Sequence, residues 1–489
     1  MDILAGLLLV ASPEVLPFLL LGVVVGLAFG ALPGLDATTG VALLLPVTYV
    51  FSPLAALVFF CALYIAGVFA GSITAILFRV PGSSEAIMTA IEGHQFTLRG
   101  ESGRALGFAM VCSAIGGLIA SAALFTVAPY LASIALKFGP TEYFALALLG
   151  LSCISAMTAE NFAKGIFASL IGLFLATVGI DAITGGKRFD FGVSTLLSGV
   201  PFVPAIIGLF AASEVYRRIA VGDVAWRRTE GGGQPNLKLP RMIEFLRIRW
   251  TILRSSLLGL AVGILPGAGA TTASILAYNL EVQASKDRSG FGTGKVEGIA
   301  APESANNAAA VGAMIPLLAL GIPGSGTTAV LMGAFLVHNL VPGPLLFVQQ
   351  PDLVSGLLVG ITLSNILILL FALLFVRLFA RLMLVPYPIL ATGILSISVT
   401  GALAFGDTNM VMIMLCFAVL GMVLEALEYP LAPIVLGLVL GPIVETSLRR
   451  ALLISDYDPW VFFERPISAA LLAVAALFFV APIVRAFRA

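Results

Sequence analysis

The chain has 489 residues, of which 60% are hydrophobic and 11% are charged, and its formal net charge is zero. Soluble domains carry about 25% charged residues, so this composition excludes an ordinary soluble protein, and the neutral balance gives no sign of a nucleic-acid-binding surface. A helix crosses a bilayer with about 20 apolar residues, and no charged residue stands between Ala105 and Leu136. We therefore expect an all-α, polytopic membrane protein embedded in the lipid bilayer.

The first half of the chain carries two interruptions of its apolar segments. The segment 14–51 is broken by Leu32-Pro33-Gly34, and the apolar segment 53–77 is followed by Pro81-Gly82-Ser83-Ser84. The first basic residue of the chain is Arg79. The positively charged start of a signal peptide is therefore missing, and we expect no cleavable signal peptide. Because basic residues concentrate on cytoplasmic loops, the N-terminus should be periplasmic and the loop 79–104 cytoplasmic. The other spans expected in this half are 105–127, 141–158, 165–180 and 193–216.

A basic segment separates the two halves. Residues 217–254 contain eight arginines and Lys238, and a Gly-Gly-Gly-Gln-Pro stretch lies among them. We interpret this segment as a cytoplasmic linker, because an excess of Lys and Arg marks the cytoplasmic side.

The second half should begin with a hairpin that enters and leaves the membrane on the same side. Its apolar segment 255–280 contains Leu265-Pro266-Gly267 and has basic residues on both flanks, which a single crossing would place on opposite sides. Residues 301–321 then cross the membrane and lead to Pro323-Gly324-Ser325. The remaining spans are expected at 352–376, 385–403, 408–426, 431–448 and 467–486, which gives about eleven crossings, two hairpins and a cytoplasmic C-terminus.

This arrangement has one conflict with the distribution of basic residues. It leaves Arg449 and Arg450 on the outer side, although basic residues normally concentrate on the cytoplasmic side. Either the nearby acidic residues Asp456, Asp458 and Glu464 offset them, or the number of spans differs by one.

Both halves contain the same motif. Residues 26–40 and 259–273 are identical at ten of fifteen positions, and a shorter Pro-Gly-Ser echo follows each of them. Matching Pro/Gly interruptions in two halves of an apolar chain are typical of secondary transporters built from inverted repeats. We therefore divide the chain into a first repeat at 1–216 with breaks at 32–39 and 81–84, the linker at 217–254, a second repeat at 255–448 with breaks at 265–272 and 323–328, and a C-terminal loop and last helix at 449–489.

The breaks combine the residue types that a binding site inside a membrane needs. Irregular backbone survives there only where protein buries it or where it lines a wet cavity. In each hairpin motif Pro and Gly stop the helix, and a Thr-Thr pair follows that can cap the next helix and offer hydroxyls. The N-terminus of that helix suits a carboxylate, and carbonyls suit Na⁺. The alternative, that Pro and Gly only kink packed helices, is less consistent with four breaks in two matching pairs.

The richest polar stretch within an expected span is Ala301–Ala309. The adjacent amides of Asn306 and Asn307 are costly in lipid, so they should face a site or bond to another helix. Glu303 can be a cap at the membrane surface or a ligand for a cation or a proton. Asp36, in the first hairpin, can bind Na⁺ or H⁺ or lie in water at the rim.

We expect no enzymatic activity. The four cysteines lie in apolar stretches and match neither a metal site nor a disulfide framework, and the two histidines, His94 and His338, are isolated. Gly292-Thr293-Gly294-Lys295 lacks the first glycine and the final Ser or Thr of a P-loop. A hydrolase that used Ser83 or Ser84 with His94 would have no visible orienting acid.

Four stretches are similar to the large membrane subunit of the bacterial tripartite tricarboxylate transporters. They are Gly30–Leu35, Leu265–Gly269, Ala301–Ala308 and Gly321–Ser325, and the loop Arg188–Gly192 also fits. The resemblance implies a cation-coupled uptake system of the bacterial inner membrane, in which this subunit forms the path for a di- or tricarboxylate such as citrate. It implies two partners, a small membrane subunit with about four helices and a periplasmic solute-binding protein, and an elevator-type movement of the hairpins.

The breaks and the polar stretch 301–309 give the expected site. The coupling ion would be Na⁺ or H⁺, with no other cofactor, and a homodimer of the complex is left open. The expected substrate-binding residues are Gly34, Thr38, Thr39, Gly267, Thr271, Thr272, Asn306, Asn307, Ser83 and Ser325, and the expected cation-binding residues are Asp36, Glu303, Ser304, Thr327 and Thr328. Asp36 stands where the resemblance leads us to expect a small or amide residue. The alternative function is a channel or exporter for small organic anions that works without a binding protein.

Overall fold

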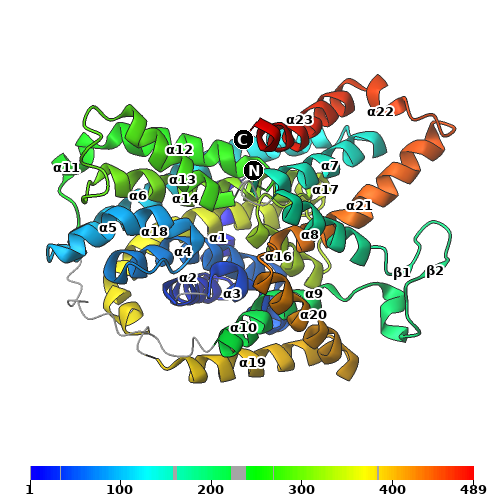
Figure 1. Cartoon of the computed structure of the whole chain (residues 1–489), viewed down its shortest axis with the longest axis horizontal. Helices are drawn as coiled ribbons and strands as arrows, with labels where there is room; N and C mark the ends of the chain where they lie inside the picture. The colour runs from blue at the N-terminus through cyan, green and yellow to red at the C-terminus, as the bar shows by residue number, and fades with distance from the viewer. Residues whose placement is uncertain are drawn as a thin grey trace.

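The computed structural model describes residues 2–32, 35–157, 162–221, 238–267, 269–382 and 385–488, and nearly all of the elements in these ranges are helices (Figure 1). A short hairpin pairs β1 (Gly179–Ile180) with β2 (Lys187–Arg188). The α-helices are α1 (Ile3–Val10), α2 (Leu16–Ala31), α3 (Ala37–Leu44), α4 (Pro53–Phe78), α5 (Ile87–Leu98), α6 (Ser102–Ala135), α7 (Pro140–Met157), α8 (Phe162–Leu175), α9 (Phe202–Ile206), α10 (Ser213–Val221), α11 (Met242–Arg247), α12 (Arg249–Ile264), α13 (Gly269–Ala284), α14 (Glu297–Gly312), α15 (Met314–Leu320), α16 (Gly326–Val337), α17 (Pro344–Gln349), α18 (Pro351–Leu382), α19 (Tyr387–Leu403), α20 (Thr408–Ala426), α21 (Ala432–Ile454), α22 (Val461–Glu464) and α23 (Pro466–Arg488). The shorter helices are η1 (Pro46–Val50), η2 (Ser84–Ala86), η3 (Ser194–Ser198) and the π-helical η4 (Ile207–Ala212).

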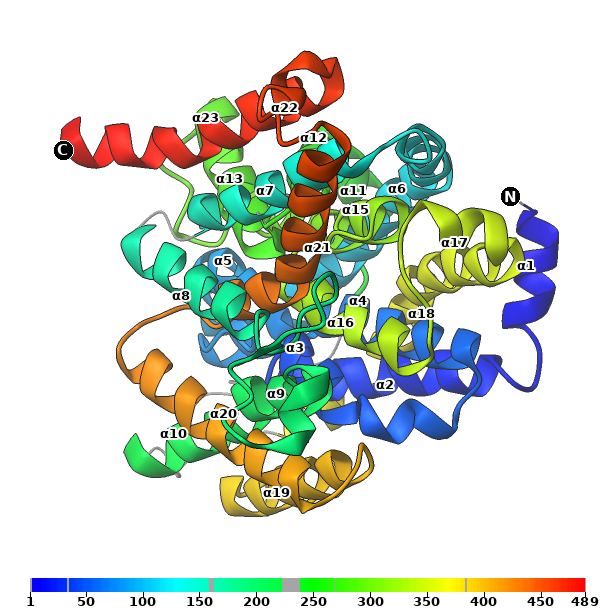
Figure 2. The same ribbon diagram turned by 90° about the vertical axis from the view of Figure 1, so that its right-hand side faces the viewer.

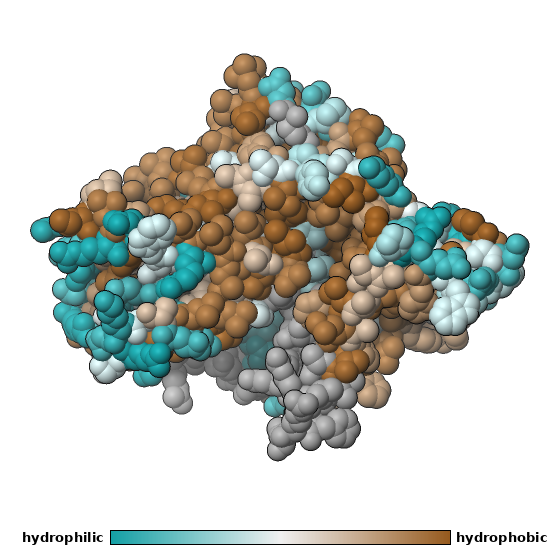
Figure 3. Space-filling model, turned by 90° about the horizontal axis from the view of Figure 1, so that it is seen from above, coloured by the Kyte–Doolittle hydropathy of each residue, from teal (hydrophilic) through white to brown (hydrophobic). Residues whose placement is uncertain are grey.

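The distribution of surface hydropathy is that of a membrane protein. Figure 3 shows hydrophilic residues gathered at the two ends of the long axis, with hydrophobic residues covering the surface between them. α5 and α11 lie towards one of these ends, and the β1–β2 hairpin lies at the other (Figure 1). Five helices in the described part of the chain, α4, α6, α18, α20 and α21, are long and apolar enough to cross a bilayer. Large exposed side chains such as Phe167, Leu370 and Val419 fit a lipid-facing surface.

In the first half, glycines hold two helices in close contact. A Cβ atom added to Gly26 would lie 2.3 Å from the carbonyl oxygen of Leu63, and one added to Gly30 would lie 2.1 Å from that of Gly67. These glycines are one helical turn apart on α2 and face α4, which is the small-residue spacing that brings membrane helices together. α2 ends at Ala31 and α4 ends at Phe78, so both helices stop where the motifs begin.

The second half contains the same kind of helix pair. A Cβ atom on Gly259 would lie 2.2 Å from the carbonyl oxygen of Ala305, and one on Gly263 would lie 2.3 Å from that of Ala309, so α12 lies against α14. α12 ends at Ile264, and α15 ends at Leu320, followed by Gly321 with φ +72°. All four motifs therefore fall at helix ends.

The long helices connect the two halves. α6 of the first half packs along α14 of the second, and α18 of the second half packs along α4 of the first. α6 and α18 also pack against each other. Seen along the long axis, α3 and α16 lie near the middle of the molecule, with α19 and α23 at opposite edges (Figure 2). α3 and α16, which follow two of the breaks, are thus surrounded by protein.

Several helices coincide with the apolar segments predicted from the sequence. α4, α7 and α20 begin and end within a residue of the predicted limits. The segment 79–104 differs, because it holds helix α5 where the charges led us to expect only a loop. The segment 193–216 differs as well, because its α-helical part starts at Phe202, after Pro201, and is preceded by the 3₁₀ helix η3.

Candidate transport site at the four breaks

Two hydrogen bonds bring breaks from opposite halves of the chain together. The hydroxyl oxygens of Thr38 and Thr327 are 2.8 Å apart, and those of Ser84 and Thr271 are also 2.8 Å apart. The first bond joins the hairpin break of the first half to the second break of the second half. The other joins the hairpin break of the second half to the second break of the first. Residues that are 289 and 187 positions apart in sequence thus meet in one region.

The two breaks within each half are also in contact. The amide of Gly267 donates a hydrogen bond of 2.9 Å to the carbonyl oxygen of Gly324. In the first half, a Cβ atom on Gly82 would lie 2.1 Å from the carbonyl oxygen of Gly30, so only glycine fits there. All four breaks therefore meet in one cluster, which is buried at Thr38 and Thr327 and reaches the surface at Ser84 and Thr271.

Asp36 is the N-cap of α3. Its carboxylate accepts a hydrogen bond of 2.9 Å from the amide of Thr39 and one of 3.0 Å from the hydroxyl of the same residue. Asp36 is half-buried, which places it neither deep in the protein nor fully in water. Its neighbour Gly34, an expected substrate ligand, lies outside the described residues.

The hydroxyls of Ser325 and Thr328 cap α16. The amide of Thr328 donates to the Ser325 hydroxyl at 3.2 Å, and the amide of Ser325 donates to the Thr328 hydroxyl at 2.7 Å. The phenol oxygen of Tyr64, on α4, lies 3.3 Å from the Ser325 hydroxyl. The side chains of Ser325 and Thr328 therefore satisfy the backbone amides at the N-terminus of α16, in the reciprocal arrangement called a capping box.

The polar residues of α14 are fully buried. Glu303, Ser304, Asn306 and Asn307 all have no exposed surface. The amide of Asn307 makes no hydrogen bond with the described part of the chain. Asn306, Ser304 and Ser83 have no well-aligned hydrogen bond there, although they lie close to Glu303, Cys112 and Glu85 respectively. Buried polar groups without partners are rare in native proteins, so these residues are the first candidates for contact with a ligand. Thr272, by contrast, is half-buried.

A cavity of about 530 Å³ reaches the breaks of the first half. Its lining includes Asp36, Thr39 and the segment 81–84, together with Glu214 and Glu425. Glu214 is paired with Arg217 and Arg218 at 2.7 and 2.5 Å, and Glu425 lies 3.5 Å from Arg217. Asp36 is the lining carboxylate for which the described structure gives no basic partner.

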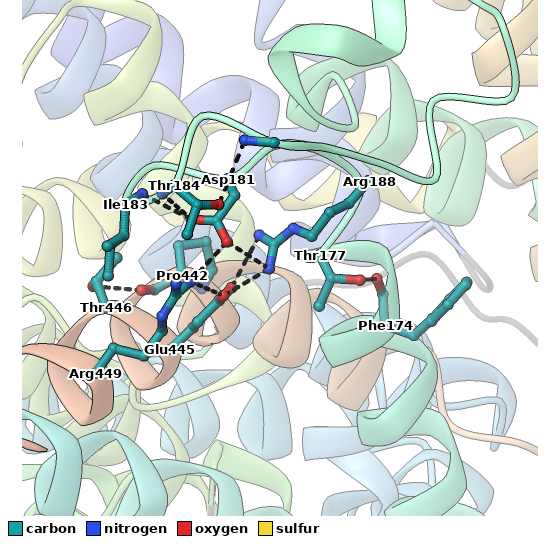
Figure 4. Close-up of polar contacts among 11 residues, drawn as sticks. Phe174, Thr177, Asp181, Ile183, Thr184, Arg188, Pro442, Glu445, Thr446 and Arg449 are labelled. Atoms are coloured by element: carbon teal, nitrogen blue, oxygen red, sulfur yellow. Dashed lines mark hydrogen bonds and ion pairs between the residues drawn. The ribbon is translucent and has the colours of Figure 1, made fainter. Parts of the chain in front are cut away.

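A larger cavity, of about 1160 Å³, opens at the end that carries the β1–β2 hairpin. An ion-pair network, shown in Figure 4, lines it. Arg449 donates to Asp181 at 2.7 Å and to Glu445 at 3.0 Å, and Arg188 donates to both oxygens of Glu445 at 2.7 and 3.2 Å. The sequence suggested Asp456, Asp458 or Glu464 as the groups that offset Arg449, but the groups that pair with it are Asp181 and Glu445.

The network fixes the hairpin loop to α21, and this predicts the effect of removing one carboxylate. The hydrogen bond from Arg449, with those from the amides of Ile183 and Thr184, lowers the pKa of Asp181 well below its usual range. A lowered pKa means that the stabilisation is present above the unfolded-state value of about 3.9 and is lost as the pH falls through the folded-state value. Asp181→Asn at pH 7 should therefore loosen the loop, seen as faster hydrogen–deuterium exchange at the amides of Ile183 and Thr184.

The control for this prediction is Asp190→Asn, just after β2, whose side chain has no ion pair in the described structure. No exchange difference between Asp181→Asn and the wild type at pH 7 would show that the loop is held by its backbone alone.

Three residues near the breaks were not predicted as site residues. Ser84 rather than Ser83 contacts Thr271, and Tyr64 contacts Ser325. Ser72, on α4, lies beside Glu303. The sequence offers little indication of these three contacts, because Tyr64 and Ser72 are isolated polar residues within an apolar segment and Ser84 cannot be told apart from Ser83 by its position.

Comparison with known proteins gives a family. Residues 16–436 match the model of the tripartite tricarboxylate transporter TctA family. The chain is 37% identical over 479 residues to an "Uncharacterized 52.8 kDa protein in TAR-I ttuC' 3'region" of Agrobacterium vitis, a match that covers 97% of this chain and 95% of that protein. It is also 37% identical over 217 residues to an "Uncharacterized protein in TAR-II ttuC' 3'region" of the same organism, covering 44% of this chain and 90% of that protein. No solved structure matches.

The matched range contains all four breaks, both helix pairs and the buried polar residues of α14. This membrane protein therefore belongs to the tripartite tricarboxylate transporter TctA family, which is a family of transporter subunits.

Proposed function

We propose that this chain is the translocation subunit of a binding-protein-dependent, cation-coupled secondary transporter that imports di- or tricarboxylates across the bacterial inner membrane. The observation that carries the proposal is the pair of bonds, Thr38 to Thr327 and Ser84 to Thr271, that gathers four interruptions in one place. Interrupted helices meeting in the middle of a bundle are the usual way in which transporters build a substrate site.

The two halves are proposed to be inverted repeats. Each half has a close helix pair, α2 with α4 and α12 with α14, and each contributes one long helix to the other half, α6 and α18. Each of the two bonds between the halves joins the hairpin break of one half to the second break of the other half. A two-fold relation would produce these reciprocal contacts, and it would allow a fold that opens to either side by movement of the hairpins.

The substrate carboxylates are proposed to bind to helix N-termini, hydroxyls and amides. Among the described residues of the breaks, 32, 35–39, 81–84, 265–267, 269–272 and 323–328, no side chain is basic. α3, α13 and α16 begin there. The caps Asp36 and Ser325 already bond to the amides of Thr39 and Thr328, so the other N–H groups of these first turns are the ones proposed to meet an anion. The hydroxyls of Thr38, Thr39, Thr271, Thr272, Ser83 and Ser325 and the amides of Asn306 and Asn307 complete the proposed substrate site, and Asp36, Glu303, Ser304, Thr327 and Thr328 are proposed for the cation.

The polar ends of the molecule suggest its orientation and its partners. The end with α5 and α11 would face the cytoplasm, and the end with the β1–β2 hairpin would face the periplasm, where a solute-binding protein delivers the substrate. A small membrane subunit would complete the complex. This orientation puts the larger cavity on the delivery side.

The function is tested by uptake of labelled citrate and a panel of dicarboxylates into proteoliposomes, with the two partner proteins present or absent, under an imposed Na⁺ or H⁺ gradient. Gradient-driven uptake that requires the binding protein is the expected result. Equilibrating flux that ignores both the gradient and the binding protein would instead favour the channel.

Thr271→Val is expected to reduce uptake about tenfold or more. The substitution removes a hydroxyl that bonds to Ser84 in the other half and that is proposed to contact the substrate. A hydrogen bond from a hydroxyl to a charged substrate carboxylate contributes ~1.5–3 kcal/mol. Initial uptake rates in the same proteoliposomes give the measurement. The matched control is Thr362→Val on α18, whose hydroxyl bonds only to the Leu358 carbonyl of its own helix, at 2.9 Å. Equal rates for both variants would mean that Thr271 only packs.

A further inference from the structure

Glu303 lies at the meeting point of four helices, with no exposed surface. Its carboxyl group, on α14, contacts the hydroxyls of Ser72 on α4 and Thr89 on α5 through one oxygen. The other oxygen, Oε2, lies 2.6 Å from the hydroxyl of Ser113 on α6. These three neighbours are neutral hydroxyls, and the neutral side chain of Asn306 also interacts with the carboxyl group. The position excludes the role of a surface cap that its place in the sequence also allowed.

In the part of the chain that the structure describes, no basic side chain bonds to Glu303 or interacts with it. The titratable group that faces Glu303 from α6 is the neutral thiol of Cys112. On the other packed elements, Glu92 bonds to Tyr278, His94 bonds to the Ile76 carbonyl, Arg104 pairs with Glu244, Arg254 pairs with Glu281, and Glu85 lies near Asp36 and Tyr64. An ionised Glu303 would therefore be a buried charge without a counter-charge, which is costly.

Ser113 can satisfy either protonation state of Glu303 without a change in backbone position. Its hydroxyl lies 2.6 Å from Oε2 and 3.3 Å from the backbone carbonyl oxygen of Glu303. When the carboxylate is ionised, the hydroxyl donates to Oε2. When Oε2 carries a proton, that O–H donates to Ser113 Oγ, and the Ser113 hydroxyl turns and donates to the backbone carbonyl. A hydroxyl is both donor and acceptor, which this exchange requires.

A second buried glutamate shows the contrast. Glu92, on α5, is also fully buried, but its carboxylate accepts hydrogen bonds from the amides of Gly292, Gly294 and Lys295 at 2.6, 2.8 and 2.9 Å. An amide N–H can only donate, so the two amides at Oε2 offer no acceptor for a proton there. The one hydroxyl bonded to Glu92 in the described structure is that of Tyr278, 2.9 Å from Oε1. The difference between the two sites lies in the chemistry of the neighbours, since burial is the same.

From this geometry we infer that Glu303 is a reversible proton-binding site whose two states are both stabilised by Ser113. The proton adds to Oε2 from water and returns to water, and no other bond is made or broken. Because Glu303 has no contact with solvent in this conformation, the exchange takes place when the bundle opens. The assignment of this proton as the coupling ion rests on the proposed transport function.

The direct test is pH-difference infrared spectroscopy of the purified full-length protein. We expect a carboxylic C=O band that grows as the pH is lowered, that is lost in Glu303→Gln and that is retained in the control Glu92→Gln. Ser113→Ala should shift this band, because the bond from the protonated oxygen is removed, whereas a purely structural serine would leave it in place. A full set of pH-dependent bands in Glu303→Gln, or a band that responds to Na⁺ and not to pH, would overturn the inference.

Transport is measured separately. In proteoliposomes, Glu303→Gln should lose the stimulation of uptake by an imposed proton gradient, and Glu92→Gln should keep it; stimulation unchanged in Glu303→Gln would refute the coupling role. If the wild type transports no carboxylate, the proposed function fails, while the infrared bands still decide whether Glu303 binds a proton.

Discussion

Replacing Asn307 by leucine is expected to reduce uptake by about ten- to a hundredfold and, at the same time, to raise the thermal stability of the protein. The Asn307 amide is fully buried, and neither its oxygen nor its nitrogen has a partner in the described structure. A buried polar group without a partner destabilises a fold by about 1–3 kcal/mol, and a hydrogen bond to a charged ligand contributes ~1.5–3 kcal/mol. The two effects therefore have opposite signs if the amide serves a ligand.

Initial uptake rates and the Tm in detergent measure the two effects on one preparation. The control is Ser398→Ala on α19, a helix outside the cluster of breaks, whose hydroxyl is also buried and without a partner. It should not lower the Tm, and it should leave uptake unchanged. A lower Tm in Asn307→Leu would contradict the assignment, since it would mean that the amide stabilises the fold.

Local sequence signals predicted where the helices end. Pro and Gly interrupt a helix by their own covalent structure, so the ends of α2, α4, α12 and α15 follow from the motifs without knowledge of any neighbour. The length of the apolar stretch likewise predicted both ends of the span 408–426, which coincides with α20. These features depend on residues close together in the chain.

Partners across the bundle could not be predicted in this way. The bond between Ser84 and Thr271 joins residues 187 positions apart, and nothing in either motif selects Ser84 over Ser83. Glu303 was left between a surface cap and an ion ligand, because the three hydroxyls that surround it come from three other helices. The stretch 292–295 failed the P-loop pattern, and its amides bind a carboxylate of the chain itself, Glu92.

The helix pairs give the second large prediction, which concerns folding. Gly259→Val should prevent recovery of a monodisperse protein, because its Cβ would lie 2.2 Å from the carbonyl oxygen of Ala305 and 2.7 Å from the Cα atom of the same residue. These are backbone atoms of α14, so no side chain can turn away and the two helices must separate. Overpacking usually costs about 1–3 kcal/mol and more where the neighbours cannot move. Size-exclusion chromatography and the Tm in detergent provide the measurement.

Gly393→Val is the matched control, because Gly393 also lies inside a helix, α19, and a Cβ there would meet no atom within 4 Å. It carries the same loss of helix propensity, so a difference between the two variants isolates the contact between helices. A normal elution profile and Tm for Gly259→Val would show that α12 and α14 do not touch at this point. Gly26→Val tests the same contact in the first half, where the Cβ would lie 2.3 Å from the Leu63 carbonyl oxygen. Because Gly26 and Gly259 occupy the same position of the repeated motif, equal losses for the two variants would mean that each half is built on the same helix pair, as the inverted-repeat proposal requires.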